Sequence, residues 1–215
     1  MSGRTSTERA GAAVGPRQTR RARGARRKGR RRAVLWITVL SLGAATAGLI
    51  AVLGPLEETI KEITLPLRHE DIIRQQAREK NLDPALIAAV IYGESKFRER
   101  TSDAGAVGLM QILPATADFV ARKTGGTRFQ HSDLSDPQIN ISYGSWYLRY
   151  LLDLYGGNRV AAVAAYNAGR RHVDRWGGRG LTIDHIRFPE TRQYTEEVLD
   201  KRDEYARRYR KELGR

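Results

Sequence analysis

Hydrophobic residues along this 215-residue chain form one long uninterrupted run, followed by several shorter runs with polar positions between them. The long run, Ala33 to Leu56, contains 24 residues and no charge. The shorter runs repeat at helical spacing, and several begin after an Asp or Asn and end at Gly, which are common helix start and stop signals. The pattern therefore predicts one helix of membrane length followed by a mainly helical domain.

Capping residues and prolines set the helix boundaries that the sequence predicts. The expected helices are 84–95 after Asp83, 114–123 closed by Gly125-Gly126, 136–155, 159–167 after Asn158, and 190 to about 212. A weaker pattern predicts a helix over 70–80, and a few residues around Leu181 to Ile186 suggest a strand. We interpret the polar segment 57–82 as a stalk that precedes the domain.

The helix over 136–155 has a wide face of large side chains. Tyr143, Tyr147 and Tyr150 recur with leucines at 151 and 154 at i, i+4, i+7, i+8 and i+11, which predicts a buried face. Trp146 lies at the edge of that face. Because sugar rings pack on aromatic side chains, Trp146 is a candidate border of a sugar groove.

Glu94 occupies an unusual place at the end of the first domain helix. Ile87, Val90 and Ile91 form an apolar stripe. Glu94 lies four residues after Val90 and three after Ile91, so helical spacing places it on the buried side. Burial disfavours a carboxylate anion and raises its pKa, which suits a general acid. The alternative is an ordinary last-turn glutamate that turns out to solvent.

The segment after this helix is too apolar for a simple surface turn. Gly105 and Gly108 allow the backbone to approach another group closely. Gln111 stands among Leu109, Met110 and two further apolar residues, and a buried amide needs hydrogen-bond partners or a ligand. Gln111 is therefore a candidate pocket residue.

Charge is concentrated at the N-terminus. Residues 1–32 hold twelve Arg or Lys and one Glu, and so contribute +11 of the formal net charge of +14. Such a tail cannot bury a core, and we expect it to be disordered. It contains no aromatic residue that could stack on bases, which argues against nucleic-acid binding.

The apolar run gives the basic tail a simpler explanation. At about 1.5 Å per residue it is roughly 36 Å long, enough to cross a hydrocarbon core of about 30 Å. The positive-inside rule then keeps the tail cytoplasmic and exports the C-terminal region. We expect a single-pass anchor at 33–56 with an extracytoplasmic domain over 83–215. A cleavable signal peptide is the alternative, because Ala45-Thr46-Ala47 resembles a cleavage site.

The chain has no cysteine, which excludes disulfides, thiol catalysis and cysteine-ligated zinc. No metal-binding motif is found, and His131 has no partner at ligand spacing, so no metal or other cofactor is expected.

Five motifs in order resemble the soluble lytic transglycosylase (SLT, family 1) domain of the lysozyme-like superfamily. They are Glu94-Ser95; Ser102 with Gly105 to Gln111; Asn140-Ile141 with Gly144 and Tyr147-Leu148; Ala165 to Gly169; and Glu190-Thr191-Arg192 with Tyr194. The resemblance covers residues 83–199. It departs at Arg170-Arg171, because a proline often follows the glycine in that family.

The resemblance implies a lysozyme-like helical domain that cleaves peptidoglycan glycan strands without water. In the family, one glutamate protonates the glycosidic oxygen between N-acetylmuramic acid and N-acetylglucosamine, then acts as base toward the C6 hydroxyl to form a 1,6-anhydro ring. This implies Glu94 as the catalytic residue. The implied substrate-binding residues are Ser102, Met110, Gln111, Tyr166, Asn167 and Tyr194.

Two other functions fit the same motifs. A goose-type lysozyme-like muramidase would deliver water, normally with help from an aspartate, for which Asp103 is the nearest candidate. An inactive peptidoglycan-binding scaffold would use only the anchor and the tail.

Overall fold

The computed structural model describes residues 64–214. The predicted basic tail, the apolar segment Ala33 to Leu56 and the first part of the stalk lie outside these residues. Within 64–214, none of the helices combines the length and apolar character needed to cross a membrane.

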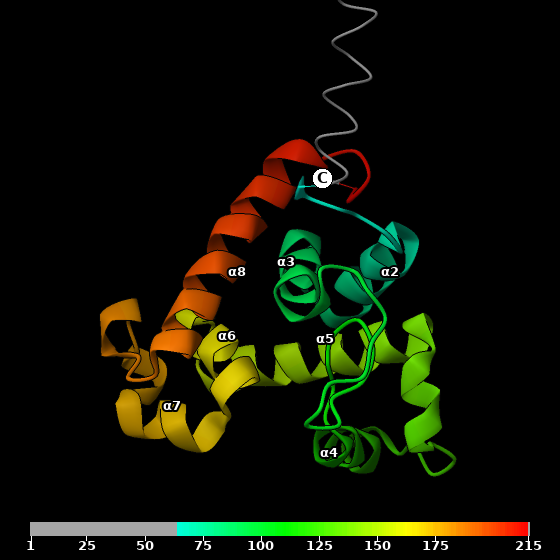
Figure 1. Cartoon of the computed structure of the whole chain (residues 1–215), viewed down its shortest axis with the longest axis horizontal. Helices are drawn as coiled ribbons and strands as arrows, with labels where there is room; N and C mark the ends of the chain where they lie inside the picture. The colour runs from blue at the N-terminus through cyan, green and yellow to red at the C-terminus, as the bar shows by residue number, and fades with distance from the viewer. Residues whose placement is uncertain (1–63, 215) are drawn as a thin grey trace, which may run out of the picture. The chain divides into compact units, whose positions relative to one another are not determined.

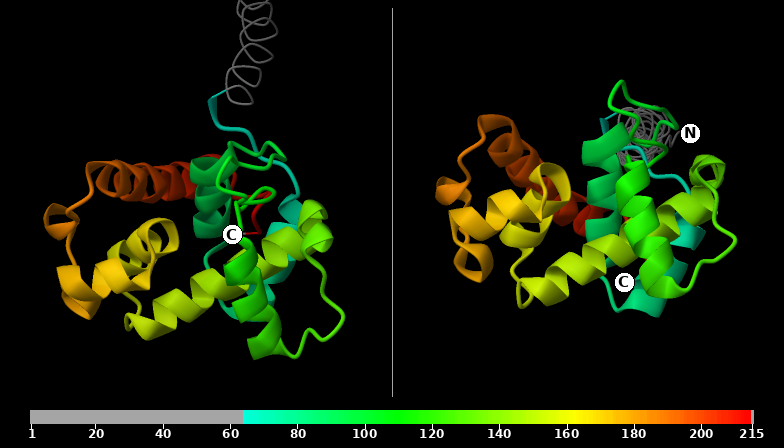
Figure 2. Two further views of the ribbon diagram at one scale, coloured as in Figure 1. Left: turned by 60° about the horizontal axis from the view of Figure 1, so that its bottom comes forward. Right: turned by 90° about the horizontal axis from the view of Figure 1, so that it is seen from below.

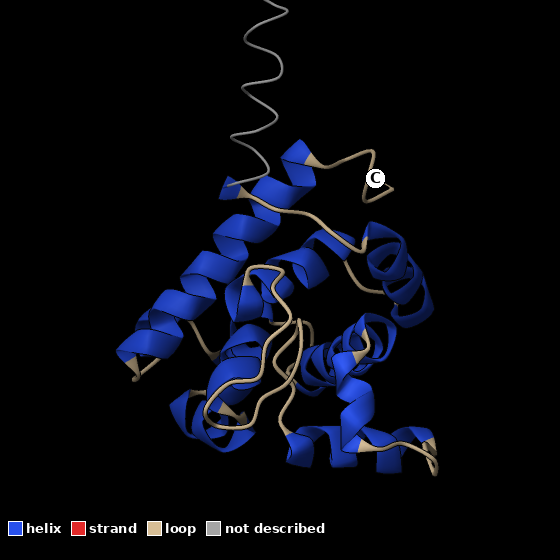
Figure 3. Cartoon of the chain, turned by 45° about the vertical axis from the view of Figure 1, so that its right-hand side comes forward, coloured by secondary structure: helices blue, strands red, loops and turns tan. Residues whose placement is uncertain are grey.

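The described part of the chain consists of helices joined by loops (Figure 3). The α-helices are α2 (Glu70–Lys80), α3 (Pro84–Ser95), α4 (Pro114–Thr124), α5 (Pro137–Leu154), α6 (Arg159–Ala168), α7 (Arg170–Trp176) and α8 (Pro189–Arg208). Three 3-10 turns, η1 (His131–Ser135), η2 (Gly178–Gly180) and η3 (Ile183–His185), complete the described elements. The prediction of a mainly helical domain is confirmed, while the suspected strand at 181–186 is wrong because this segment contains η3.

Predicted caps begin three of these helices. Asp83 accepts a hydrogen bond from the Ala85 amide at 3.0 Å, Asp136 accepts from the Gln138 amide at 2.7 Å, and Asn158 accepts from the Ala161 amide at 3.2 Å. Each side chain satisfies an amide that has no partner within the helix. Asp83 also forms an ion pair with Arg202 at 2.6 Å, which joins the start of α3 to α8.

α3 lies at the centre of the described domain, with α8 and α2 packed against it (Figures 1 and 2). Every residue from Ala85 to Ile91 is at most 1% exposed. Ile87, Val90 and Ile91 are buried as predicted, but the residues between them are buried as well, so this part of α3 has no solvent-facing side. A helix that is apolar around its whole circumference is the kind that a protein core buries.

Residues 64–82 differ from the predicted stalk, because they pack into the domain. Leu65 and Ile73 are fully buried in the core. The hydroxyl of Tyr205 donates to the Pro66 carbonyl at 2.5 Å, and that of Tyr209 donates to the Leu65 carbonyl at 2.6 Å. The domain therefore includes α2 and the segment that precedes it.

The buried face of α5 overlaps the predicted one at Leu151. Its buried apolar residues are Ile141, Leu148, Leu151 and Leu152. Tyr143, Tyr147 and Tyr150 lie beside that face and are half-buried. Gly144 lies within this buried part of α5 and packs against Met110 of the loop that follows α3.

Candidate active site

Glu94 lies in the last turn of α3, where its side chain is half-buried between α3 and α8. Tyr194 donates its hydroxyl hydrogen to Oε1 of Glu94 at 2.7 Å. Burial raises the pKa of Glu94 to about 7, although the Tyr194 hydrogen bond and the positive charge of Arg100 act in the opposite direction. At neutral pH the carboxyl group is therefore divided between its acid and base forms.

Gly93 allows α8 to come this close to α3. A Cβ at residue 93 would lie 2.9 Å from Cγ2 of Val198 and 3.0 Å from Cε2 of Tyr194. The contact with Val198 would be closer than real Cβ atoms come, and the contact with Tyr194 would be tighter than most of them. The absence of a side chain at residue 93 thus places the Tyr194 hydroxyl within hydrogen-bond reach of the neighbouring glutamate.

The loop over 96–113 folds back onto the end of α3. Ser95 donates to the Leu109 carbonyl at 2.7 Å, and Arg100 donates to the main-chain carbonyl of Glu94 at 2.8 Å. The Gly108 amide donates to the Arg100 carbonyl at 2.8 Å. These contacts hold the predicted apolar loop next to Glu94.

The side chain of Asn140 in α5 holds the same loop in place. Its Nδ2 donates to the carbonyls of Val107 and Leu134, each at 2.9 Å, and its Oδ1 accepts from the Met110 amide at 2.8 Å. The side chain is only 1% exposed. The side-chain amide is therefore hydrogen-bonded at both Nδ2 and Oδ1, with two bonds to the loop and one to Leu134 of η1.

Gln111 obtains its hydrogen-bond partners from its own loop. Its Nε2 donates to the carbonyls of Arg100 at 2.9 Å and Gly108 at 2.7 Å. Its backbone has a φ of 46°, a left-handed conformation that is uncommon outside glycine. Gln111 therefore holds the bend of the loop, and its side chain remains half-buried.

Met110 differs from the prediction that it contacts substrate. Its side chain is fully buried and packs so closely on Gly144 that a Cβ there would lie 2.4 Å from the Met110 sulfur. The main chain of Met110 contributes to the site instead, because its carbonyl accepts a hydrogen bond from the Tyr166 hydroxyl at 3.0 Å.

Tyr166 lies close to Glu94 across the site. Burial, and secondarily the negative charge of Glu94, raise the pKa of Tyr166 well above its usual value. Tyr166 therefore stays protonated and donates a hydrogen bond. The site thus brings together Glu94, Tyr166 and Tyr194 from α3, α6 and α8, with Met110 and Gln111 in the loop between them.

Two predicted residues make their contacts elsewhere. Ser102 accepts from the Ala106 amide at 3.0 Å and closes a turn of the loop. Asn167 is exposed and accepts from the Thr191 hydroxyl at 2.8 Å, which ties the end of α6 to α8. Within residues 64–214, no hydrogen bond joins either side chain to Glu94.

Sequence reasoning missed the roles of Arg100 and Ser95, which hold the loop on the end of α3. Ser95 was part of a motif, but nothing in the pattern indicated a contact with Leu109. Arg100 was one of several charged residues in 96–103. Its contact with the Glu94 carbonyl depends on how the loop folds back, which the local sequence does not show. Asp103, the nearest alternative carboxylate in sequence, is exposed in the turn that Ser102 closes.

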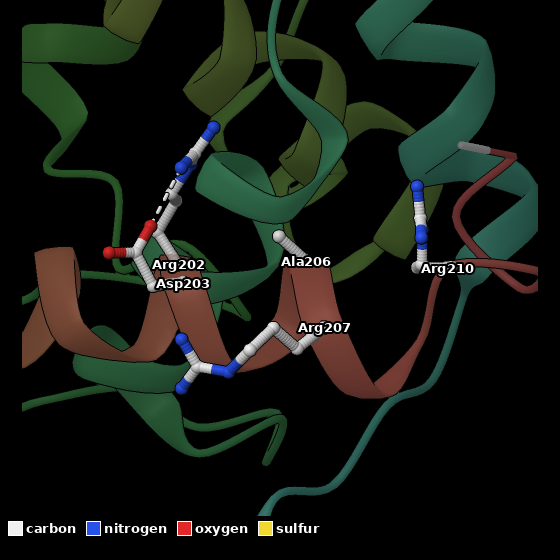
Figure 4. A pocket seen from close by; sticks show the side chains of 5 residues that line it. All are labelled: Arg202, Asp203, Ala206, Arg207 and Arg210. Carbon is white, nitrogen blue, oxygen red and sulfur yellow. Dashed lines mark hydrogen bonds and ion pairs between the residues drawn. The ribbon is translucent and has the colours of Figure 1, made fainter.

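A hollow lies on the C-terminal half of α8 (Figure 4). It is lined by Arg202, Asp203, Ala206, Arg207 and Arg210. Arg202 donates to Asp203 at 2.7 Å, and this hydrogen bond is the main reason that the pKa of Asp203 is lowered. A carboxyl that is ionised so readily cannot act as a general acid near neutral pH, so Glu94 remains the candidate acid.

The family model described as "Transglycosylase SLT domain" matches residues 71–184. The soluble lytic murein transglycosylase of Salmonella typhimurium is 33% identical over 155 residues, which cover 68% of this chain and 24% of that protein. The membrane-bound lytic murein transglycosylase C of Glaesserella parasuis is 32% identical over 137 residues, covering 54% of this chain and 38% of that protein. This chain thus spans about a quarter of the length of the soluble relative.

Solved structures that resemble this chain are likewise lytic transglycosylases. An inactive mutant of the lytic transglycosylase Slt from Pseudomonas aeruginosa aligns with a TM-score of 0.65 and 34% identity, covering 69% of this chain and 25% of that one. The 70 kDa soluble lytic transglycosylase of Escherichia coli aligns with a TM-score of 0.65 and 31% identity, covering 74% of this chain and 27% of that one.

Proposed function

Because the chain belongs to the transglycosylase SLT domain family, we propose that it is a peptidoglycan lytic transglycosylase, a carbon-oxygen lyase with Glu94 as its single acid and base. The substrate is the β-1,4 bond between N-acetylmuramic acid and N-acetylglucosamine. The observation that carries the proposal is the half-buried carboxyl of Glu94, whose pKa of about 7 supplies both protonation states near neutral pH.

The proposed reaction has two steps. In the first, the protonated carboxyl of Glu94 donates its proton to the glycosidic oxygen, the bond from that oxygen to C1 of the muramic acid breaks, and the acetamide of the same sugar stabilises C1. In the second, the Glu94 carboxylate takes the proton of the C6 hydroxyl while O6 bonds to C1. The product carries a 1,6-anhydro ring, Glu94 is protonated again, and no water is consumed.

The surroundings of Glu94 support a mechanism with one carboxylate. Glycosidases that use two carboxylates hold them about 5 to 9.5 Å apart. In the described part of the chain, the side chains that shift the pKa of Glu94 are Tyr194 and Arg100, and no second carboxyl is among them. A muramidase would need an aspartate near Glu94 to direct water. Asp103 is exposed on its turn and is not among the groups that shift the pKa of Glu94, which favours the lyase.

Tyr194 and Tyr166 have complementary proposed roles. Tyr194 donates to Oε1 of Glu94, which orients the carboxyl and favours its ionised form after the first proton transfer. Tyr166 keeps its proton and holds the Met110 carbonyl, which fixes the loop wall of the site. Ser102, Gln111 and Asn167 are proposed to border the glycan as exposed or half-buried polar groups.

We also propose that Ala33 to Leu56 is a single-pass membrane anchor, with the basic tail cytoplasmic and the catalytic domain extracytoplasmic. The charge asymmetry around the apolar run supports this topology, and one relative is named membrane-bound. The chain has no native cysteine, so single cysteines can report it. In intact cells a membrane-impermeant maleimide should label Ser132→Cys, whereas Ser6→Cys should react only after the membrane is opened.

The catalytic proposal is tested by comparing the full chain with Glu94→Gln on purified peptidoglycan. Glutamine keeps the shape of the side chain but cannot donate and retrieve the proton, so release of soluble fragments should fall by at least about a thousandfold. Glu99→Gln, which makes the same change on an exposed loop residue, is the control and should remain active. An active Glu94→Gln variant would exclude Glu94 as the acid.

A further inference from the structure

A second hollow borders the candidate site on the side of α4 and α5. It is lined by Ala115, Thr116, Phe119, Tyr147 and Arg170. The ring of Tyr147 lies 5.7 Å from that of Tyr166, centroid to centroid. Tyr166 in turn bonds the loop next to Glu94, so one aromatic side chain separates the hollow from the reacting groups.

Arg170 is the charged member of this hollow. It is exposed, and its guanidinium donates to the Tyr150 hydroxyl at 3.0 Å. No carboxylate among residues 64–214 forms an ion pair with it. Since a guanidinium carries five N–H donors in a planar fork, donors remain for an anion that enters the hollow.

Aromatic rings hold Arg170 in place. Its guanidinium carbon lies 5.6 Å from the centroid of the Tyr150 ring. Tyr150 itself is stacked on Trp146 with an interplanar angle of 6° and packs edge-on against Phe119. A side chain held on a rigid platform loses little freedom when it binds, which favours a specific contact over a loose surface charge.

We propose that this hollow binds a carboxylate of the peptide stem carried by the muramic acid, and that Arg170 is the residue that recognises it; this inference rests on the proposed function. The N-acetylated sugars of such a strand are neutral, because the lactyl group of the muramic acid is joined to the stem by an amide. The nearest anionic groups are the stem carboxylates. Arg170 and a carboxylate form two parallel hydrogen bonds, while Phe119 and Tyr147 provide apolar contact for the stem.

Arg170 is the charged side chain that lines the hollow. We therefore expect a preference for charged stems that depends on this one side chain.

The test measures binding and cleavage separately in the full chain. For binding, the Glu94→Gln background is titrated with a soluble disaccharide carrying a peptide stem, and with the same compound after its stem carboxylates are converted to carboxamides. Adding Arg170→Gln should weaken binding of the charged compound about 10- to 100-fold and leave binding of the amidated compound unchanged. Arg170→Lys should keep part of the preference, because it retains the charge but not the fork.

Arg171→Gln is the matched control, because it removes the same charge from the neighbouring exposed residue, which does not line the hollow. It should keep the full preference. Equal weakening of both compounds by Arg170→Gln, or no weakening of either, would overturn the inference by showing a purely structural role or none.

Cleavage of native and amidated peptidoglycan by the chain with Glu94 intact then separates the two proposals. Loss of the charge preference in Arg170→Gln with cleavage retained supports both. Binding that depends on Arg170 while neither substrate is cleaved supports the carboxylate site and contradicts the proposed function. Cleavage without any dependence on Arg170 contradicts the carboxylate site alone.

Discussion

Tyr194 donates its hydroxyl hydrogen to Oε1 of Glu94 at 2.7 Å, although 100 residues separate them in the chain. The contact depends on the packing of α8 against α3 at Gly93, where no side chain intervenes. Burial raises the pKa of the glutamate, and the tyrosine limits that rise. The pair thus sets the proton affinity of the proposed catalytic group.

The pH dependence of the reaction should follow Glu94. The free enzyme must hold this carboxyl in its protonated form, which predominates below its pKa of about 7. We therefore expect kcat/KM to fall as pH rises through about 7, approaching a tenfold loss per pH unit above it. A rate profile between pH 5 and 9 measures this limb. A midpoint near 4.5, the ordinary value for glutamate, would show that burial does not tune this group.

Removing the Tyr194 hydroxyl should move that limb. The hydrogen bond favours the ionised form of Glu94, so Tyr194→Phe should raise the pKa of Glu94 and shift the falling limb upward by roughly one pH unit. At pH 6 the rate should also fall about 10- to 100-fold, because the carboxyl loses its orientation. Tyr92→Phe is the control, because it removes a hydroxyl from the same helix as Glu94 without changing this hydrogen bond. A limb that does not move in Tyr194→Phe would contradict the assigned role of the tyrosine.

Gly93→Ala should separate activity from stability. The new Cβ would meet Tyr194 and Val198 at about 3 Å and push the tyrosine away from Glu94. Crowding costs about 1 to 3 kcal/mol, but alanine gains about 1 kcal/mol over glycine within a helix. The melting temperature should therefore change by only a few degrees, while kcat falls about tenfold or more. Unchanged turnover would mean that close approach of α8 is not needed for catalysis.

Asn140→Ala should loosen the loop that forms the wall of the site. It leaves the Val107 and Leu134 carbonyls and the Met110 amide without their partner. Buried groups left unpaired should lower the free energy of unfolding by about 2 to 4 kcal/mol, as measured by urea denaturation. Gln138→Ala, an exposed amide on the same helix, should cost less than about 1 kcal/mol. Similar losses in the two variants would show that Asn140 does not organise the loop.

Local signals in the sequence predicted the α-helices of the domain apart from α7, and the motifs named Glu94, Tyr166 and Tyr194, which lie together in the structure. Asp83, Asp136 and Asn158 cap helices as expected, because capping depends on a few adjacent residues. Glu94 was found through its motif and its neighbours. The predicted stripe is buried, but residues 85–91 are buried around the whole helix, so the apolar pattern alone cannot show which neighbour faces residue 94.

Contacts between distant segments could not be read from local patterns. Leu65 and Pro66 are held to the domain by hydrogen bonds from Tyr209 and Tyr205, which lie 144 and 139 residues later in the chain. The partners of Gln111 and the burial of Met110 likewise follow from how the loop folds back on itself and onto α5. Periodicity reports which residues share one face of an element, but not which other element covers that face.

The masses of the products formed from purified peptidoglycan distinguish a lyase from a hydrolase. We expect fragments that end in 1,6-anhydro-muramic acid, each lighter by one water than the corresponding hydrolysis product, and their absence from a parallel digest with Glu94→Gln. Fragments with reducing ends would contradict the proposed lyase reaction, because they would show that water, and not the C6 hydroxyl, attacks C1.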